Sequence, residues 1–152
     1  MDIKTELDNY LGEKRALIDA ITREFRGGTP AKTIARTVVS AFSRDQVTQY
    51  LAAIALHDAA RKALHEAGVG SAGDVWVTGI DAPREARLTI AADPAETPDY
   101  TALPDRIRSA LRDVQITLDL PQSEHDDITA DVIDKALLDG EPVRLVKLKP
   151  RT

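Results

Sequence analysis

The chain has 152 residues, of which 43% are hydrophobic and 30% are charged, a composition typical of a folded protein rather than a disordered one. It contains no cysteine, which excludes disulfides, thiolate catalysis and cysteine-based zinc sites. The formal net charge is −5, yet residues 1–67 hold 10 Lys+Arg against 9 Asp+Glu, and residues 68–152 hold 10 against 16. Residues 23–51, with 5 against 2, form a locally cationic region.

Targeting and catalytic signals are missing from the sequence. The first ten residues, MDIKTELDNY, lack the apolar core of a signal peptide, and no stretch approaches the ~20 apolar residues of a membrane span. The chain also shows no nucleophile motif and no phosphate-binding loop in a suitable context. We therefore expect a cytoplasmic protein that is not an enzyme, uses no cofactor and does not enter a membrane.

The first segment is predicted to be an amphipathic helix with one buried face. Its apolar residues recur at helical spacing, at Ile3, Leu7, Tyr10, Leu11, Leu17, Ile18, Ile21 and Phe25. Gly27 and Gly28 are expected to end this helix. Thr29 can then cap a second helix with Pro30 at its first position, where the missing N–H costs nothing. The expected inward face of this second helix contains Ile34, Ala35 and Val38.

A third helix is predicted to begin after Ser43, because Ser43 and Gln46 have the spacing of a capping box. Val47, Tyr50, Leu51 and Ile54 lie on one expected face of it. The Ala-rich run to Ala67 has no helix breaker, and its apolar residues shift to another face, at Leu56, Ala60, Ala63 and Leu64. This second stripe has no evident internal partner, so we expect a bend or a second contact surface there, and a homodimer through this stripe or through the second half of the chain.

Residues 68–73, GVGSAG, are predicted to be a linker between two domains, 1–67 and 74–152. Their glycines match the spacing of a dinucleotide-binding loop. Such a loop needs a strand before it and a helix after it, so that the phosphate meets the helix N-terminus. Here the expected order is reversed, which favours a flexible linker.

After the linker the apolar period changes to two, which is typical of strands. Strands are expected around Val75 and Val77, at Leu88, Ile90 and Ala92, at residues 116–120 and at residues 142–149. Helices are expected at residues 104–113 and 128–137. The order ββαβαβ predicts an α+β fold, in which the N-terminal helical domain is followed by a small sandwich with helices on one face of a sheet.

Two groups of residues are weighed as metal ligands. His57 and His65 lie eight residues apart on the expected third helix, and are interpreted as exposed surface histidines because a metal site needs three or four converging ligands. His125, Asp126 and Asp127 form a loop whose aspartates suit a helix N-cap, and nothing nearby completes a coordination sphere. We expect no metal site. Trp76 is either an exposed anchor or a residue that packs on the sheet.

Residues 34–51, IARTVVSAFSRDQVTQYL, resemble the helix-turn-helix of bacterial transcription regulators. The matching positions are Ile34, Ala35, Phe42, Ser43, Val47, Tyr50 and Leu51. Ala35 is small enough to let two helices cross closely, and Val38, Phe42, Val47 and Leu51 are expected to fill the space between them. The connection departs from the usual motif, because Val38–Phe42 is about two residues longer and contains no glycine.

The resemblance implies that the helix after Ser43 lies in the DNA major groove. Arg44, Asp45, Thr48 and Gln49 would then face base edges, where arginine favours guanine and glutamine favours adenine. Lys32 and Arg36 would contact phosphates and fix the register. Ser43 belongs to the same expected DNA-binding surface.

We therefore expect a sequence-specific DNA-binding transcriptional regulator that occupies an operator as a homodimer on double-stranded DNA. The acidic domain 74–152 would serve dimerisation, the binding of a partner protein or the sensing of a small-molecule effector. The alternative is a non-enzymatic adaptor that uses the same helices to bind another protein. The acidity of the second half favours this alternative, since it would repel DNA at close approach.

Overall fold

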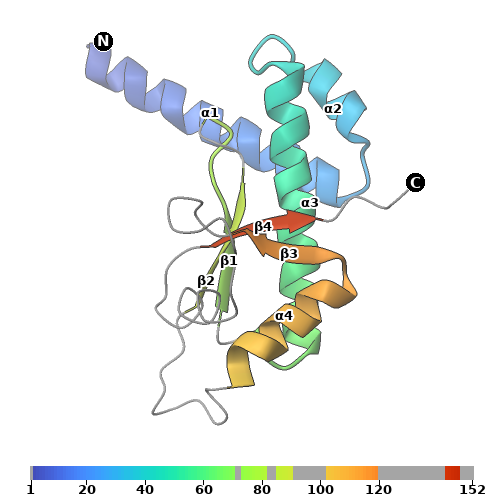
Figure 1. Ribbon diagram of the computed structural model, residues 1–152. Coiled ribbons are helices and arrows are strands. Elements are labelled where there is room, and N and C mark those ends of the chain that lie inside the picture. The colour runs from blue at the N-terminus through green and yellow to red at the C-terminus, as the bar shows by residue number, and fades with distance from the viewer. Residues whose placement is uncertain (1, 71–72, 82–84, 91–101, 120–142, 148–152) are drawn as a thin grey trace.

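The computed structural model describes residues 2–70, 73–81, 85–90, 102–119 and 143–147. The N-terminal region is helical and comprises α1 (Ile3–Arg26), α2 (Ala31–Thr37) and α3 (Arg44–Glu66) (Figure 1). The second half contains β1 (Gly73–Val77), β2 (Ala86–Ile90), α4 (Leu103–Asp113), β3 (Ile116–Asp119) and β4 (Val143–Lys147). The predicted α+β class is confirmed. In the described ranges, no helix has both the length and the apolar content that crossing a bilayer demands.

The four strands form one antiparallel sheet in the order β1-β2-β4-β3. β1 and β2 make a hairpin in which Val75 lies opposite Leu88, and β4 pairs with both β2 and β3. β1 begins at Gly73, the residue expected to end the linker. The predicted helix at residues 128–137 lies outside the described residues, so the complete ββαβαβ order stays a prediction.

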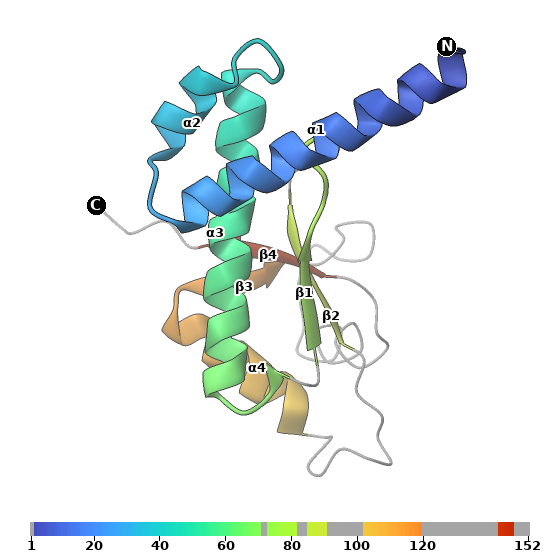
Figure 2. The same cartoon turned by 180° about the vertical axis from the view of Figure 1, so that it is seen from behind.

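Helix α1 buries only part of its predicted apolar face. Ile21 is 2% exposed and packs into the helical core, with Leu17 and Phe25 partly buried beside it. In contrast, Ile3 is 87% exposed, and Leu7, Tyr10 and Leu11 are also exposed. The expectation of one continuous buried face is therefore wrong for the N-terminal half. The reason is visible in Figure 2, where this half of α1 projects past the rest of the fold.

The start of α2 differs from the prediction by one residue. Pro30 is the N-cap, with extended backbone, and α2 begins at Ala31 without a side-chain cap. Thr29 belongs to the turn that ends α1, where its amide donates to the carbonyl of Glu24. Gly28 makes that turn with φ of 108°, a conformation that side chains rarely allow.

Helix α3 begins as predicted and contributes to two cores. The Ser43 side chain accepts from the Gln46 amide while the Gln46 side chain accepts from the Ser43 amide, which completes the capping box. The buried residues of the helical core are Ile21, Ile34, Ala35, Val38, Phe42, Val47, Tyr50, Leu51, Ile54 and Ile80. Those of the sheet core are Ala60, Leu64, Val69, Val75, Ala86, Leu88, Leu103, Ile107, Ala110, Leu111, Ile116, Val143 and Leu145.

The second apolar stripe of α3 has an internal partner, contrary to the expectation that it lacks one. Ala60 and Leu64 are buried against the sheet and α4, and Leu56 packs at the margin of the same core. In Figure 1 the lower half of α3 runs beside the sheet and α4. The predicted second contact surface is therefore confirmed, as an intramolecular one.

Each half of the chain contributes residues to the core of the other half. α3 extends from the helical core into the sheet core, and Ile80, in the hairpin after β1, packs into the helical core at 1% exposure. Val69, inside the predicted linker, is buried in the sheet core. The Lys14 ammonium of α1 also bonds the Asp81 carboxylate of the hairpin at 2.6 Å. The predicted domain boundary at residues 68–73 stays a prediction about independent folding.

A charged cluster fastens the end of α1 to the middle of α3. The Arg26 guanidinium donates to both carboxylate oxygens of Asp58 at 3.1 and 2.9 Å, and His57 Nδ1 lies 2.8 Å from the same carboxylate. Burial raises the pKa of Asp58, but hydrogen bonds from Arg26 and His57 outweigh burial, so the pKa lies below its ordinary value. Asp58 therefore stays ionised to lower pH in the folded state.

We predict that Asp58→Asn lowers the free energy of unfolding by up to about 1 kcal/mol at neutral pH, because both partners are nearly half exposed and solvent screens the pair. A lowered folded pKa gives stability that is present above the unfolded pKa and is lost as pH falls through the folded pKa. The variant and the parent should therefore begin to converge below about pH 4 and become equal only below the folded pKa of Asp58. Urea titrations across pH measure this, with exposed Asp19→Asn as control. An equal change in both variants at all pH values would contradict the prediction.

Candidate nucleic-acid interface

The region of the predicted interface is built from α2, the connection 38–43 and the first half of α3. The connection is compact because the amides of Ala41 and Phe42 both donate to the carbonyl of Val38, at 2.9 and 3.0 Å. Val38 and Phe42 turn inward into the helical core. The six residues between the two helices exceed the usual turn of about 3–4, as the sequence indicated.

The inward and outward faces of this region separate cleanly. Ile34 and Ala35 on α2 and Val47 and Leu51 on α3 are at most 3% exposed. Ala35 lies in this packed layer, where a larger side chain would push the helices apart. The predicted DNA-binding residues are all exposed, namely Lys32, Arg36, Ser43, Arg44, Asp45, Thr48 and Gln49. The burial pattern is thus the one that the sequence periodicity predicted.

On the exposed side of α2 and the first turn of α3 taken together, three cations stand against one carboxylate, Asp45. Lys32, Arg36 and Arg44 take part in no ion pair within the described ranges of the chain. Asp45, the residue after Arg44, is the one acidic residue among the predicted interface residues, all of which are described, and it forms no ion pair with these cations. Surface cations of this kind attract phosphates through a field that salt screens.

Two residues expected to face bases are bonded to each other. The Gln49 amide nitrogen lies 3.0 Å from both carboxylate oxygens of Asp45, one turn earlier on α3. Asp45 thereby orients Gln49, and its negative charge adjoins Arg44. A carboxylate repels phosphate, and cytosine is the base whose exocyclic amine such a group accepts from in protein–DNA contacts.

Ser43 and Gln46 are engaged in the cap of α3. The Ser43 hydroxyl oxygen accepts from the Gln46 amide at 3.1 Å, which leaves its own proton to donate outward. Gln46, absent from the predicted interface, fixes the first turn of α3 through its bond to the Ser43 amide. The capping box therefore holds the exposed residues of that turn in place.

Within the described ranges, no group of three His, Asp or Glu side chains could hold a metal ion, and this includes the two histidines on α3. His65 is exposed as predicted, whereas the His57 side chain is 12% exposed and bonded to Asp58. The interpretation of His57 as an exposed residue is wrong, because its ring bonds the neighbouring Asp58, to which the end of α1 brings Arg26. The residues His125, Asp126 and Asp127 lie outside the described residues.

Trp76 combines both roles that the sequence left open. It is 37% exposed, and it pairs across the hairpin with Arg87, whose guanidinium lies 5.9 Å from the ring centroid. Its indole nitrogen donates to the Thr89 hydroxyl at 3.0 Å. The side chain is therefore anchored on the sheet while part of its surface faces solvent.

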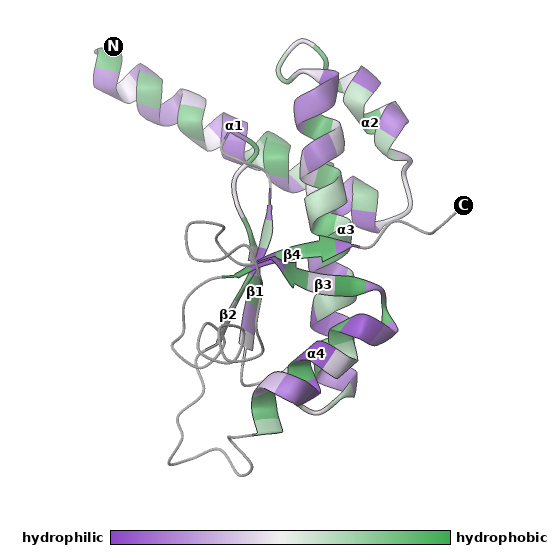
Figure 3. Cartoon of the chain, in the orientation of Figure 1, coloured by the Kyte–Doolittle hydropathy of each residue, from purple (hydrophilic) through white to green (hydrophobic). Residues whose placement is uncertain are grey.

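Sequence reasoning missed the exposed apolar stripe on α1, formed by Ile3, Leu7, Tyr10 and Leu11. Figure 3 shows apolar and polar positions alternating along the projecting part of this helix. The periodicity signals that one face is apolar, but it carries no information on what covers that face. The stripe belongs to a 24-residue helix whose C-terminal half is held in the helical core by Ile21.

Comparisons with known proteins give no family. No protein-family model matches the chain, and no match was found among curated proteins or among solved structures.

Proposed function

We propose that this protein is a sequence-specific DNA-binding transcriptional regulator that occupies an operator through a helix-turn-helix formed by α2 and α3. The N-terminal part of α3 is the recognition helix, with Arg44, Asp45, Thr48 and Gln49 toward base edges. Lys32 and Arg36 on α2 hold phosphates, and Ser43 donates from the helix start. The protein acts in the cytoplasm and without enzymatic chemistry.

One observation carries the proposal: the residues that the resemblance assigns to DNA are exposed, and the residues between them are buried. On α3, Val47 is 0% exposed and Leu51 is 1% exposed, whereas the predicted base-reading residues are exposed, with Arg44 and Asp45 before Val47 and Thr48 and Gln49 after it. The side that would meet DNA also carries three cations with no described ion-pair partner, Lys32, Arg36 and Arg44. Any amphipathic surface helix would show this burial pattern. The three cations are the additional feature that suits the negative charge of phosphates.

Selection of bound sequences from a random DNA pool, followed by fluorescence anisotropy on the selected site, tests this function. Contacts with about four to six phosphates should make log K fall linearly with log salt, with a slope of roughly −4 to −5. An unselected sequence should bind with a similar slope and lower affinity. Recovery of no preferred sequence, together with no salt-dependent binding, would reject the proposal.

Asp45 gives a further prediction about the same surface. Asp45→Asn removes a negative charge beside Arg44, so we expect the affinity for unselected DNA to rise about three- to fivefold at low salt. Asp113→Asn is the matched control, because Asp113 is an exposed aspartate at the end of α4. Anisotropy with both variants measures the effect. A rise of equal size in the control would assign the change to net charge rather than to position.

The second half has a supporting role in this proposal. A single small module reads few bases, so we propose a homodimer on a two-fold symmetric operator. The acidic half supplies dimer contacts, a partner-protein surface or effector sensing. Sedimentation at tens of micromolar tests the dimer, and a monomer would reject the symmetric-operator arrangement while leaving DNA binding open to its own test.

A second candidate function is a protein-interaction adaptor, and the exposed stripe of α1 favours it. Ile3, Leu7, Tyr10 and Leu11 present apolar surface on a projecting helix, which is the form of an anchor for another protein. Apolar contacts of this kind depend little on salt, unlike phosphate contacts. Leu7→Glu separates the candidates, since it should abolish adaptor binding and leave the affinity of the monomer for unselected DNA unchanged.

A further inference from the structure

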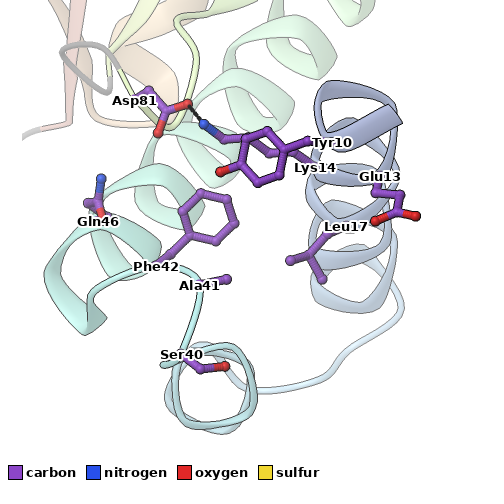
Figure 4. Close-up of a pocket in the computed structure, with 9 residues that line it drawn as sticks. All are labelled: Tyr10, Glu13, Lys14, Leu17, Ser40, Ala41, Phe42, Gln46 and Asp81. Atoms are coloured by element: carbon purple, nitrogen blue, oxygen red, sulfur yellow. Dashed lines mark ion pairs between the residues drawn. The ribbon is translucent and has the colours of Figure 1, made fainter. Parts of the chain in front are cut away.

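A pocket of about 430 Å³ lies between α1, the connection before α3 and the hairpin after β1. Figure 4 shows the residues that line it, contributed by segments far apart in the sequence. Tyr10, Glu13, Lys14 and Leu17 come from α1, and Asp81 comes from the hairpin. The remaining lining residues are Ser40, Ala41, Phe42 and Gln46. Its volume falls within the range of small-molecule sites, roughly 300–1,000 Å³.

The walls of the pocket are partly aromatic. The rings of Tyr10 and Phe42 and the side chain of Leu17 line the space between α1 and the connection (Figure 4). Phe42 belongs to the helical core and is 5% exposed, whereas Tyr10 is 59% exposed. Apolar walls with a few polar groups at the rim are the usual form of a ligand site.

The charge at the rim is negative once internal pairing is counted. Lys14 and Asp81 neutralise each other across 2.6 Å, and this hydrogen bond raises the pKa of Lys14, so its ammonium stays charged. Glu13 is exposed and has no ion-pair partner within the described ranges. The uncompensated group at the pocket is therefore a carboxylate.

One ammonium group of the protein itself, that of Lys14, already lies beside an aromatic ring and a carboxylate at this pocket. The Lys14 nitrogen lies 6.0 Å from the centroid of the Phe42 ring, at the outer range of a cation–π contact, while it bonds Asp81. Aromatic faces attract cations through the ring quadrupole, and a carboxylate adds direct attraction. The pocket therefore combines aromatic rings with a second carboxylate, Glu13, which is available to pair with a cation from solution.

We propose that this pocket binds a small organic cation, an ammonium or amidinium group on an apolar body. The apolar body lies against Phe42, Leu17 and Tyr10, and the cationic group faces Glu13. The Lys14–Asp81 bridge closes the far side and keeps the ligand between α1 and the hairpin. No bond is made or broken.

The site touches the start of α3, which gives a consequence that rests on the proposed function. Gln46 lines the pocket and also caps α3 through its bond to the Ser43 amide. A ligand that contacts Gln46 therefore acts within one turn of Arg44 and Asp45. Occupancy of the pocket changes the affinity of the exposed face for DNA, and DNA reciprocally changes the affinity for the ligand.

Isothermal titration with benzyltrimethylammonium tests the site without DNA. Benzoate and benzyl alcohol, at the same ionic strength, supply the anionic and neutral forms of a similar body. We expect measurable binding of the cation and no binding of benzoate. Glu13→Gln should weaken cation binding about fivefold, while Glu24→Gln, an exposed glutamate elsewhere on α1, should leave it unchanged. Tyr10→Ala should weaken it by a similar factor.

Two outcomes would overturn the proposal: benzoate binding as tightly as the cation, or Glu13→Gln matching Glu24→Gln. Both glutamates are exposed, so both variants are expected to fold, and circular dichroism of each variant checks this. Anisotropy with DNA, with and without the cation, then tests the coupling separately. Cation binding with no DNA binding at all would retain the site and reject the proposed function.

Discussion

Leu64→Ala is expected to lower the free energy of unfolding of the whole chain by about 2–5 kcal/mol. Leu64 is 1% exposed and lies in the sheet core, although it belongs to the helix that also carries the predicted DNA-binding residues. Truncation leaves a cavity against the sheet and α4, which cannot close because α3 is held at its other end by the helical core. Leu64→Met conserves volume and should cost less than about 1.5 kcal/mol.

The same variant tests whether the two halves fold separately. Trp76 is the single tryptophan and lies in β1, so its fluorescence reports the sheet, whereas far-ultraviolet ellipticity reports mainly the helices. Because α3 and Ile80 join the two cores, we expect the urea transitions of both signals to coincide and to move together in Leu64→Ala. A shift confined to tryptophan fluorescence would show that residues 1–67 fold alone, as the predicted boundary at residues 68–73 supposes.

Local features of the fold were predictable from the sequence because they depend on near neighbours. The capping box at Ser43 and Gln46 is specified by spacing within one turn, and the buried positions of α3 follow from helical periodicity. The strand positions around Val75 and Leu88 follow from alternation. The start of α2 was missed because the amide of Thr29 bonds to the end of α1, and this depends on the turn at Gly28.

Long-range packing was not predictable from the same patterns. Periodicity identified the stripe at Ala60 and Leu64 as apolar but could not say that the sheet covers it. Periodicity likewise could not show that Ile3 and Leu7, which are apolar at helical spacing, are exposed. A hydrophobic pattern gives the face that prefers burial, whereas the partner depends on how distant segments meet.

The part of the candidate site that depends on helical periodicity was predictable from the sequence. The exposure of Arg44, Thr48 and Gln49 follows from the positions that Val47 and Leu51 take in the core. The bond between Gln49 and Asp45 follows the spacing of four residues, though the sequence reading assigned both to bases. The pocket beside Glu13 was missed because it needs the hairpin to bring Asp81 next to α1.

The sharpest test of function compares residues by role on a selected DNA site. Arg44→Ala should cost about 1–3 kcal/mol of binding free energy on that site and relax the preference at one base position, because a bidentate contact to guanine would be lost. Lys32→Ala should weaken binding to all sequences about equally and reduce the salt slope by roughly one, because it removes one phosphate contact. Arg15→Ala, an exposed cation on α1, is the matched control for charge.

Gln49→Ala completes this comparison, since its loss also frees Asp45 from the hydrogen bonds that orient it. If Gln49 contacts a base, the variant should lose discrimination at a position different from that of Arg44→Ala, because the two residues lie more than one turn apart on α3. All four replaced side chains are exposed, so unchanged circular dichroism is expected for each variant. Unchanged binding to every sequence by folded Arg44→Ala and Gln49→Ala proteins would mean that α3 is not a recognition helix. The exposed cations of α2 and α3 would then serve another anionic partner, and the adaptor function would become the better account of the projecting α1.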